Sequence, residues 1–83
     1  MLEFPKYVGI FNSNTQKWGS ALSLTLFKDG VAQYDRPANT GGWCLTATWV
    51  NGELIVADCL AGHLIGQTLI SISEQEFQDD NSR

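Results

Sequence analysis

The dipeptide Asn51-Gly52, with alternating apolar residues on both sides, restricts the fold of this chain more than any other feature. An Asn-Gly pair between two runs of period-2 hydrophobicity is the strongest short-range signal for a two-residue β-hairpin turn. Closing the hairpin on Val50 and Glu53 places Trp49 opposite Leu54 and gathers the large apolar side chains on one face. We interpret that face as the core side of an antiparallel sheet.

The same alternation recurs along the chain, interrupted by Asn, Asp, Gly and Pro residues that favour turns. It predicts six strands, at residues 6–11, 20–27, 31–36, 43–50, 53–60 and 64–72. In the hairpin around Gly30, a three-residue loop over residues 28–30 sorts apolar from polar residues. This loop pairs Phe27 with Val31 and Leu24 with Tyr34.

The C-terminal segment has a different pattern, because Ser73 and Glu76 have the spacing of a helical capping box. We expect a short helical turn over residues 74–78. The predicted fold is all-β, a small antiparallel six-stranded meander that forms a barrel or a strongly curled sheet. Residues 1–77 form its single domain, and residues 78–83 form a flexible acidic tail.

Charge and hydropathy exclude several functions. The 83 residues include five basic and nine acidic ones, for a net charge of −4, so the chain lacks the basic patch that a nucleic acid requires. No run approaches the ~20 apolar residues of a membrane span. The first residues lack the pattern of a signal peptide. We therefore expect a cytoplasmic protein with neither nucleic acid nor membrane as its partner.

Two cysteines, Cys44 and Cys59, face each other in the register set by the Asn51-Gly52 turn. The Cα atoms of such a pair lie about 5.5 Å apart, within reach of a disulfide bond. Three interpretations stay open: two packed thiols, a disulfide, or a soft-metal site with His63 as a third ligand. Because a zinc site requires four ligands and no fourth is apparent, we assign no metal and no cofactor.

Two other polar residues could carry chemistry. His63 is the single histidine and thus the candidate general base, but no motif places a nucleophile beside it. We therefore expect that the protein is not an enzyme. Asp58 falls on the core face of the predicted hairpin, where an unpaired carboxylate is costly. It pairs with a cation or a backbone amide, is turned outward by a bulge, lies at the barrel mouth, or serves as the polar group of a binding pocket.

Four segments share a strand rhythm: Gly9-Ile10-Phe11, Leu24-Thr25-Leu26-Phe27-Lys28-Asp29-Gly30, Gly41-Gly42-Trp43 and Asn51-Gly52-Glu53-Leu54. Over residues 9–56 this rhythm resembles that of small bacterial lipocalin-like (calycin-type) β-barrels, although Phe11 stands where those proteins usually have Trp. With 83 residues, the chain is too short for eight full strands. The resemblance therefore implies a β-meander with at most a shallow apolar pocket.

The outer face of the hairpin at residues 43–60 is almost free of charge, a property more typical of contact surfaces than of solvent-facing ones. We therefore expect a non-catalytic protein-interaction module, a small inhibitor or an accessory subunit, which binds another protein or a second copy of itself. The predicted partner-binding residues are Trp18, Phe27, Thr46, Thr48 and Ile55. Trp18 is open to a second interpretation, as a core residue.

The alternative function is binding of a small apolar ligand in a lipocalin-like barrel. Its predicted pocket residues are Trp43, Trp49, Leu54 and Asp58.

Overall fold

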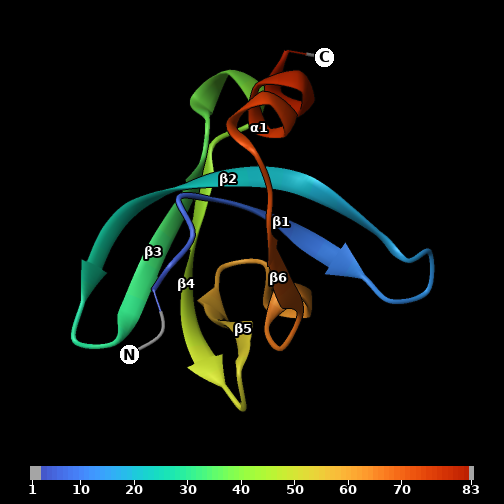
Figure 1. Cartoon of the computed structure of the whole chain (residues 1–83). Helices are drawn as coiled ribbons and strands as arrows, with labels where there is room; N and C mark the ends of the chain where they lie inside the picture. The colour runs from blue at the N-terminus through green and yellow to red at the C-terminus, as the bar shows by residue number, and fades with distance from the viewer. Residues whose placement is uncertain (1–2, 83) are drawn as a thin grey trace.

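The computed structural model describes residues 3–82 and arranges them as a closed barrel of six antiparallel strands (Figure 1). The strands are β1 (Tyr7–Asn12), β2 (Lys17–Lys28), β3 (Val31–Arg36), β4 (Trp43–Val50), β5 (Glu53–Cys59) and β6 (Thr68–Ser71). The helices are η1 (Ala38–Thr40), η2 (Gly62–Leu64) and α1 (Glu74–Asn81), of which η1 and η2 are single 3₁₀ turns. Each strand pairs with the next, and β6 pairs with β1, so the predicted all-β barrel is confirmed.

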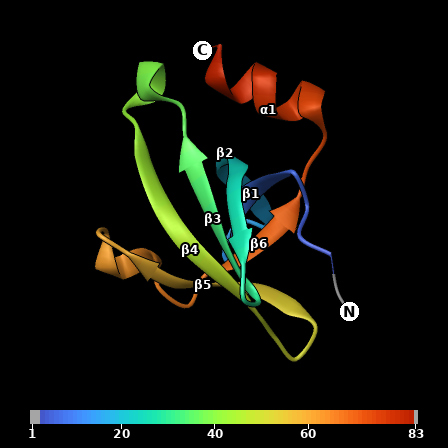
Figure 2. The same cartoon turned by 90° about the vertical axis from the view of Figure 1, so that its left-hand side faces the viewer.

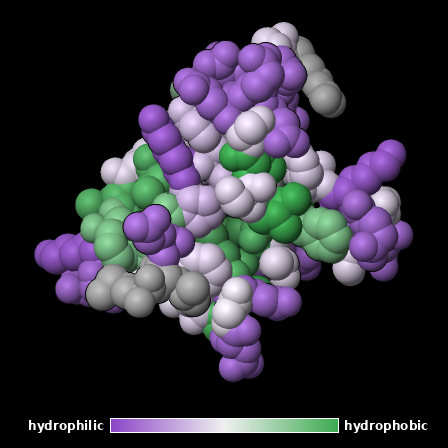
Figure 3. All heavy atoms as spheres, in the orientation of Figure 1, coloured by the Kyte–Doolittle hydropathy of each residue, from purple (hydrophilic) through white to green (hydrophobic). Residues whose placement is uncertain are grey.

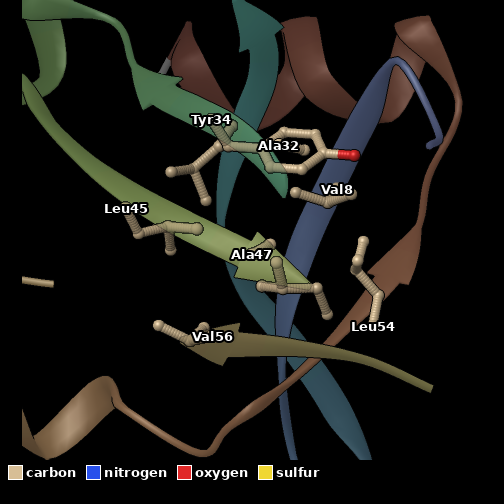
Figure 4. Packing of buried hydrophobic residues seen from close by; sticks show 9 residues of the cluster. Val8, Ala32, Tyr34, Leu45, Ala47, Leu54 and Val56 are labelled. Carbon is tan, nitrogen blue, oxygen red and sulfur yellow. The ribbon is translucent and has the colours of Figure 1, made fainter. Parts of the chain in front are cut away.

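Apolar side chains from all six strands fill the barrel interior (Figure 4). The core cluster consists of Val8, Leu22, Ala32, Tyr34, Leu45, Ala47, Leu54, Val56 and Leu69. Burying one large side chain of this kind stabilises the fold by roughly 1.5–3 kcal/mol. The ring of Tyr34 extends toward Val8, and its hydroxyl donates a hydrogen bond to the carbonyl oxygen of Pro5 at 2.6 Å. Burial raises the pKa of Tyr34 above its usual range.

Three β-bulges interrupt the pairing within the described residues, at Ser20, Thr25 and Ala57. A bulge adds one residue to one strand, which bends the strand and increases its twist. A barrel of six short strands needs strong curvature, so we attribute its closure largely to these three positions.

The first hairpin differs from the prediction at its turn. The loop has two residues, Asp29 and Gly30, with φ angles of 56° and 79°, and Lys28 pairs with Val31. Positive φ at both positions is typical of a type I′ turn, which matches the twist of the strands. The expected three-residue loop is therefore wrong, and so is the expected pairing of Phe27 with Val31, because Phe27 pairs with Ala32.

The predicted pairing of Leu24 with Tyr34 is nevertheless correct. The extra residue at Thr25 restores the register that the shorter loop would have shifted. The extra residue thus lies within β2 rather than in the turn.

The second hairpin follows the prediction through the pair of Ala47 and Val56. The bulge at Ala57 then shifts the register by one residue, so that Asp58 opposes Thr46 and Cys59 opposes Leu45. The expected pairing of Cys44 with Cys59 is therefore wrong. So is the expected core-facing position of Asp58, which is exposed on the outside of the barrel. A bulge that turns Asp58 outward was one of the alternatives at this position.

The C-terminal segment contains more helix than the sequence predicts. The capping box of Ser73 and Glu76 is confirmed, with hydrogen bonds of 3.0 and 3.1 Å in its two directions. The helix continues to Asn81 rather than ending at residue 78. Residues 78–81, which were predicted to begin a flexible tail, therefore form the last helical turn. The predicted strand at residues 64–72 is shorter, because η2 precedes it and β6 covers only Thr68–Ser71.

Helix α1 lies at the same end of the barrel as η1 in both views (Figures 1 and 2). Its Phe77 ring packs on Tyr7 of β1, with the ring centroids 4.7 Å apart. The backbone N–H of Ala21 in β2 donates a hydrogen bond to the carboxylate of Asp80 at 3.0 Å. These contacts hold the acidic helix against the outside of β1 and β2.

Candidate interaction surface

Three uncharged residues form a straight row across the outer face of three strands. Thr48 of β4 pairs with Val31 of β3 on one side and with Ile55 of β5 on the other. Directly opposed residues of antiparallel strands point to the same face, so these three side chains are neighbours on the outside of the barrel. Val31 is exposed, and Thr48 and Ile55 are half-buried.

Neighbouring uncharged residues enlarge this row into a surface that we call the outer patch, in which the polar Gln33 stands between Leu26 and Thr46. It consists of Leu26, Val31, Thr46, Thr48, Val50 and Ile55. Leu26 and Val50 are 55% and 47% exposed, which is high for aliphatic side chains. In Figure 3 hydrophobic surface gathers near the β2–β3 turn, whereas the surface over α1 is hydrophilic.

Charged residues of opposite sign stand on opposite margins of the outer patch. Lys28 of β2 pairs with Val31 at one margin. Glu53 and Asp58 belong to β5 at the other margin and lie on either side of Ile55 along the strand. All three charged side chains are exposed. The β5 margin is therefore acidic, whereas the β2 margin carries Lys28 with the exposed Asp29 of the turn next to it.

Phe27, a predicted partner-binding residue, has a different environment from the outer patch. It pairs with the buried Ala32, so it shares the inner face of the sheet and lies near the barrel end. Its ring centroid is 4.8 Å from that of Phe4, which in turn is 5.7 Å from that of Trp49. Phe27 still exposes 49% of its surface. It therefore belongs to an aromatic cluster that covers one end of the core.

Trp18 packs on the outside of the β1–β2 hairpin and does not reach the outer patch. It pairs with Phe11, and its indole ring lies directly over Gly9. A Cβ atom at Gly9 would approach the ring to 2.5 Å, so the absence of a side chain there makes room for the indole. Trp18 is half-buried, and it also lines a pocket of about 300 Å³ with Leu64. Close packing is thus its evident structural role.

The four residues of the predicted ligand pocket do not come together. Trp49 and Leu54 are cross-strand neighbours inside the barrel. Trp43 lies at the opposite end of β4 from Trp49, and Asp58 faces outward because of the bulge at Ala57.

The two cysteines and His63 do not form a common site. The thiol of Cys59 packs against the core and donates a long hydrogen bond of 3.6 Å to the carbonyl oxygen of Cys44. Both cysteines are free thiols. His63 is exposed in η2, beside a pocket of about 320 Å³ that it shares with Asn12 and Gln67. Among the residues that the structure describes, no group of three or more His, Cys, Asp or Glu side chains could hold a metal ion.

A further pocket, which we call the rim pocket, was not anticipated from the sequence. It has a volume of about 590 Å³ and lies where β3, η1 and β4 meet. Its lining residues are Gln33, Asp35, Arg36, Pro37, Ala38, Gly42, Trp43 and Cys44. Of these residues, only Trp43 was among the predicted pocket residues, and it was expected beside Trp49, Leu54 and Asp58. The pairing of Arg36 with Trp43 depends on the register between β3 and β4, which no short-range signal indicates.

Within residues 3–82, no helix is long and apolar enough to cross a membrane. Comparison of the chain with protein-family models, with curated proteins and with solved structures produced no match. The function proposed below therefore depends on the geometry and chemistry of these surfaces.

Proposed function

We propose that this protein is a non-catalytic interaction module that associates with a second copy of itself through the outer patch. The observation that carries the proposal is the straight outer row of Val31, Thr48 and Ile55 across three strands. An apolar surface of this kind on a sheet is typical of a contact site. Four of the nine acidic residues lie in α1, outside the patch, so the net charge does not accumulate on this face.

The arrangement of charge favours a second copy of the chain as the partner that covers the outer patch. A closed dimer has a two-fold axis, and the same patch is used by both subunits. When the two-fold axis runs parallel to β4, the two sheets face each other and their strands follow in opposite order. Lys28 of each copy then lies on the same side of the dimer as the β5 margin of the other copy, where Glu53 and Asp58 are. Such rim charges contribute little affinity but orient the two subunits.

The curvature of a small barrel limits the area that two convex faces can bury. We therefore expect a reversible dimer with a dissociation constant between about 1 µM and 1 mM. Sedimentation velocity over a series of protein concentrations measures this directly. The expected result is a sedimentation coefficient that rises with concentration. A protein that stays monomeric over the whole series contradicts the proposal, and capture of a different protein on this face would then identify a heterologous partner.

Variants locate the interface. Thr48→Lys places a charge at the centre of the patch, where the two-fold axis brings both copies of the side chain together, and should abolish dimerisation. Thr15→Lys is the matched control, because Thr15 is exposed in the β1–β2 turn, outside the patch. Dimerisation of the Thr48→Lys variant at wild-type strength would exclude this face.

A charge exchange tests the orientation of the two copies. Lys28→Glu should weaken the dimer, because it places like charges over Glu53 and Asp58. Adding Glu53→Lys and Asp58→Lys to this variant restores opposite charges and should restore association. Equal weakening by the single and the combined variants would refute the two-fold arrangement.

A further inference from the structure

The structure also points to a small-molecule site, and we propose that the rim pocket binds a small organic carboxylate with a flat apolar body. Arg36 would hold the carboxylate, and Trp43 would contact the apolar part. The two residues are cross-strand partners at the adjoining ends of β3 and β4. The pocket volume of about 590 Å³ falls within the range of roughly 300–1,000 Å³ that is typical of ligand sites. This inference is independent of self-association.

Arg36 is half-buried, and one of its guanidinium nitrogens lacks a hydrogen-bond partner in the protein. Its Nε atom is buried and has no hydrogen-bond partner among residues 3–82. A buried donor without an acceptor costs about 1–3 kcal/mol, because its water is lost and not replaced. The guanidinium group presents its donors in a planar fork that matches the two oxygens of a carboxylate. Because Nε is sealed from solvent, a bound carboxylate would accept a hydrogen bond from it only after the Arg36 side chain shifts toward the pocket.

The neighbouring acid does not fill this role. Asp35 lies on the opposite face of β3 from Arg36 and pairs with Cys44, and one of its carboxylate oxygens accepts a hydrogen bond from the Gln33 side chain at 3.4 Å. Asp35 nevertheless lines the pocket together with Gln33 and Cys44, which share its face of the sheet. An anion beside Arg36 also has the indole of Trp43 next to it, and an aromatic surface favours a flat apolar ligand body.

The wall of the pocket is held in place before any ligand binds. The carbonyl oxygen of Pro37 accepts hydrogen bonds from the backbone N–H groups of Thr40 and Gly42, at 3.0 and 3.1 Å. The Thr40 hydroxyl is also 3.3 Å from the side-chain oxygen of Asn81, which connects η1 to α1. Gly42 has φ of 31°, and a Cβ atom there would lie 3.0 Å from the Cα atom of Ala38. A wall fixed in this way lowers the ordering cost of binding.

The test uses 3-phenylpropionate as the probe and 3-phenylpropanamide as its uncharged control. Drug-like ligands gain about 0.3 kcal/mol per non-hydrogen atom, so a probe of this size should bind in roughly the millimolar range. Binding is followed by the amide shifts in two-dimensional NMR spectra of the ¹⁵N-labelled full chain. We expect the acid to shift the signals of Gly42, Trp43 and Cys44 together, and the amide to bind at least about 10-fold more weakly.

Two substitutions of Arg36 separate charge from geometry. Arg36→Gln should weaken binding of the acid by about 10-fold or more, and Arg36→Lys by a smaller factor, because Lys keeps the charge but loses the fork. Lys17→Gln is the matched control, since Lys17 is a cation beside a different tryptophan, Trp18, in a different pocket. It should leave binding unchanged. Spectra of each free variant that overlay on those of the wild type show that the fold is intact.

Alkylation of the cysteines supplies a second readout. Cys44 lines the pocket, whereas Cys59 packs against the core, so Cys59 is an internal control. The acid should slow the reaction of iodoacetamide with Cys44 and leave the rate at Cys59 unchanged, as measured by mass spectrometry. Equal affinity for acid and amide would overturn the proposal, as would shifts that map elsewhere or the absence of binding at millimolar probe.

Discussion

Replacement of Gly9 by alanine tests how closely the β1–β2 hairpin is packed against Trp18. The new Cβ atom would lie 2.5 Å from Cε3 and 2.7 Å from Cδ2 of the indole. Carbon atoms in contact normally lie about 3.5–4.0 Å apart, so the ring or the strand must retreat by roughly 1 Å. Overpacking of this kind costs about 1–3 kcal/mol. Since the φ angle of Gly9 is not positive, backbone strain adds nothing.

Chemical denaturation monitored by circular dichroism gives the change in the free energy of unfolding. We expect Gly9→Ala to be destabilised by about 1–3 kcal/mol. In a Trp18→Ala background the obstacle is absent, and Gly9→Ala should be neutral or stabilise the protein by about 0.5–1 kcal/mol through reduced backbone freedom. The double-mutant cycle therefore predicts a coupling energy of about 1–4 kcal/mol between the two positions.

Gly19 provides the matched control in the same hairpin. It lies in β2, and no atom is within 4 Å of a Cβ atom built at this position. Gly19→Ala should therefore be neutral or slightly stabilising. If Gly9→Ala were equally harmless, or if its cost persisted without Trp18, the indole would not be packed on Gly9 as described.

Two other substitutions test contacts that hold the barrel together. Tyr34→Phe removes the hydrogen bond to Pro5 and should cost about 1 kcal/mol near neutral pH. Because burial raises the pKa of Tyr34, the phenol stabilises the folded state below about pH 10 and loses this contribution as the pH rises further. The stability difference between wild type and Tyr34→Phe should thus shrink in alkaline denaturation series, and a constant difference would contradict the assignment. Asp80→Asn weakens the acceptor for the Ala21 backbone N–H and should increase hydrogen exchange at that amide, whereas unchanged exchange would show that α1 is held by its other contacts.

The turn at Asn51-Gly52 and the identity of most core strands follow from local sequence signals, whereas the two-residue loop at Asp29-Gly30 was predicted with the wrong length. Asn51 and Gly52 have φ angles of 52° and 84°, and they produce the expected hairpin as far as Ala47 and Val56. The strands predicted at residues 31–36 and 43–50 coincide with β3 and β4. The backbone sterics of one or two residues determine a turn such as Asn51-Gly52. Such a turn can therefore be predicted without knowledge of the rest of the chain.

The bulges were not predictable in this way. Ser20, Thr25 and Ala57 resemble ordinary strand residues in composition. Gly19 before Ser20 and the costly core-facing position of Asp58 after Ala57 are compatible with bulges, but they do not fix where a bulge occurs. A bulge is placed where the sheet must bend to close, and that demand comes from all six strands together. Its consequences are large, because the bulge at Ala57 alone moves Asp58 outward and separates the two cysteines across the sheet.

The two candidate sites differ in the same way: local sequence signals predict part of the outer patch, whereas the rim pocket depends on the tertiary structure. The outward position of Thr48 and Ile55 follows from their distance to the Asn51-Gly52 turn, because the intervening strand is regular. The rim pocket depends instead on the pairing of Arg36 with Trp43 and on the contact of η1 with α1. The alternation of apolar residues and the backbone preferences of turn residues act over a few positions. They can therefore be recognised in the amino-acid sequence. Curvature, helix docking and the pairing of Arg36 with Trp43 depend on many weak interactions among distant parts of the chain, so they are determined only when the barrel closes.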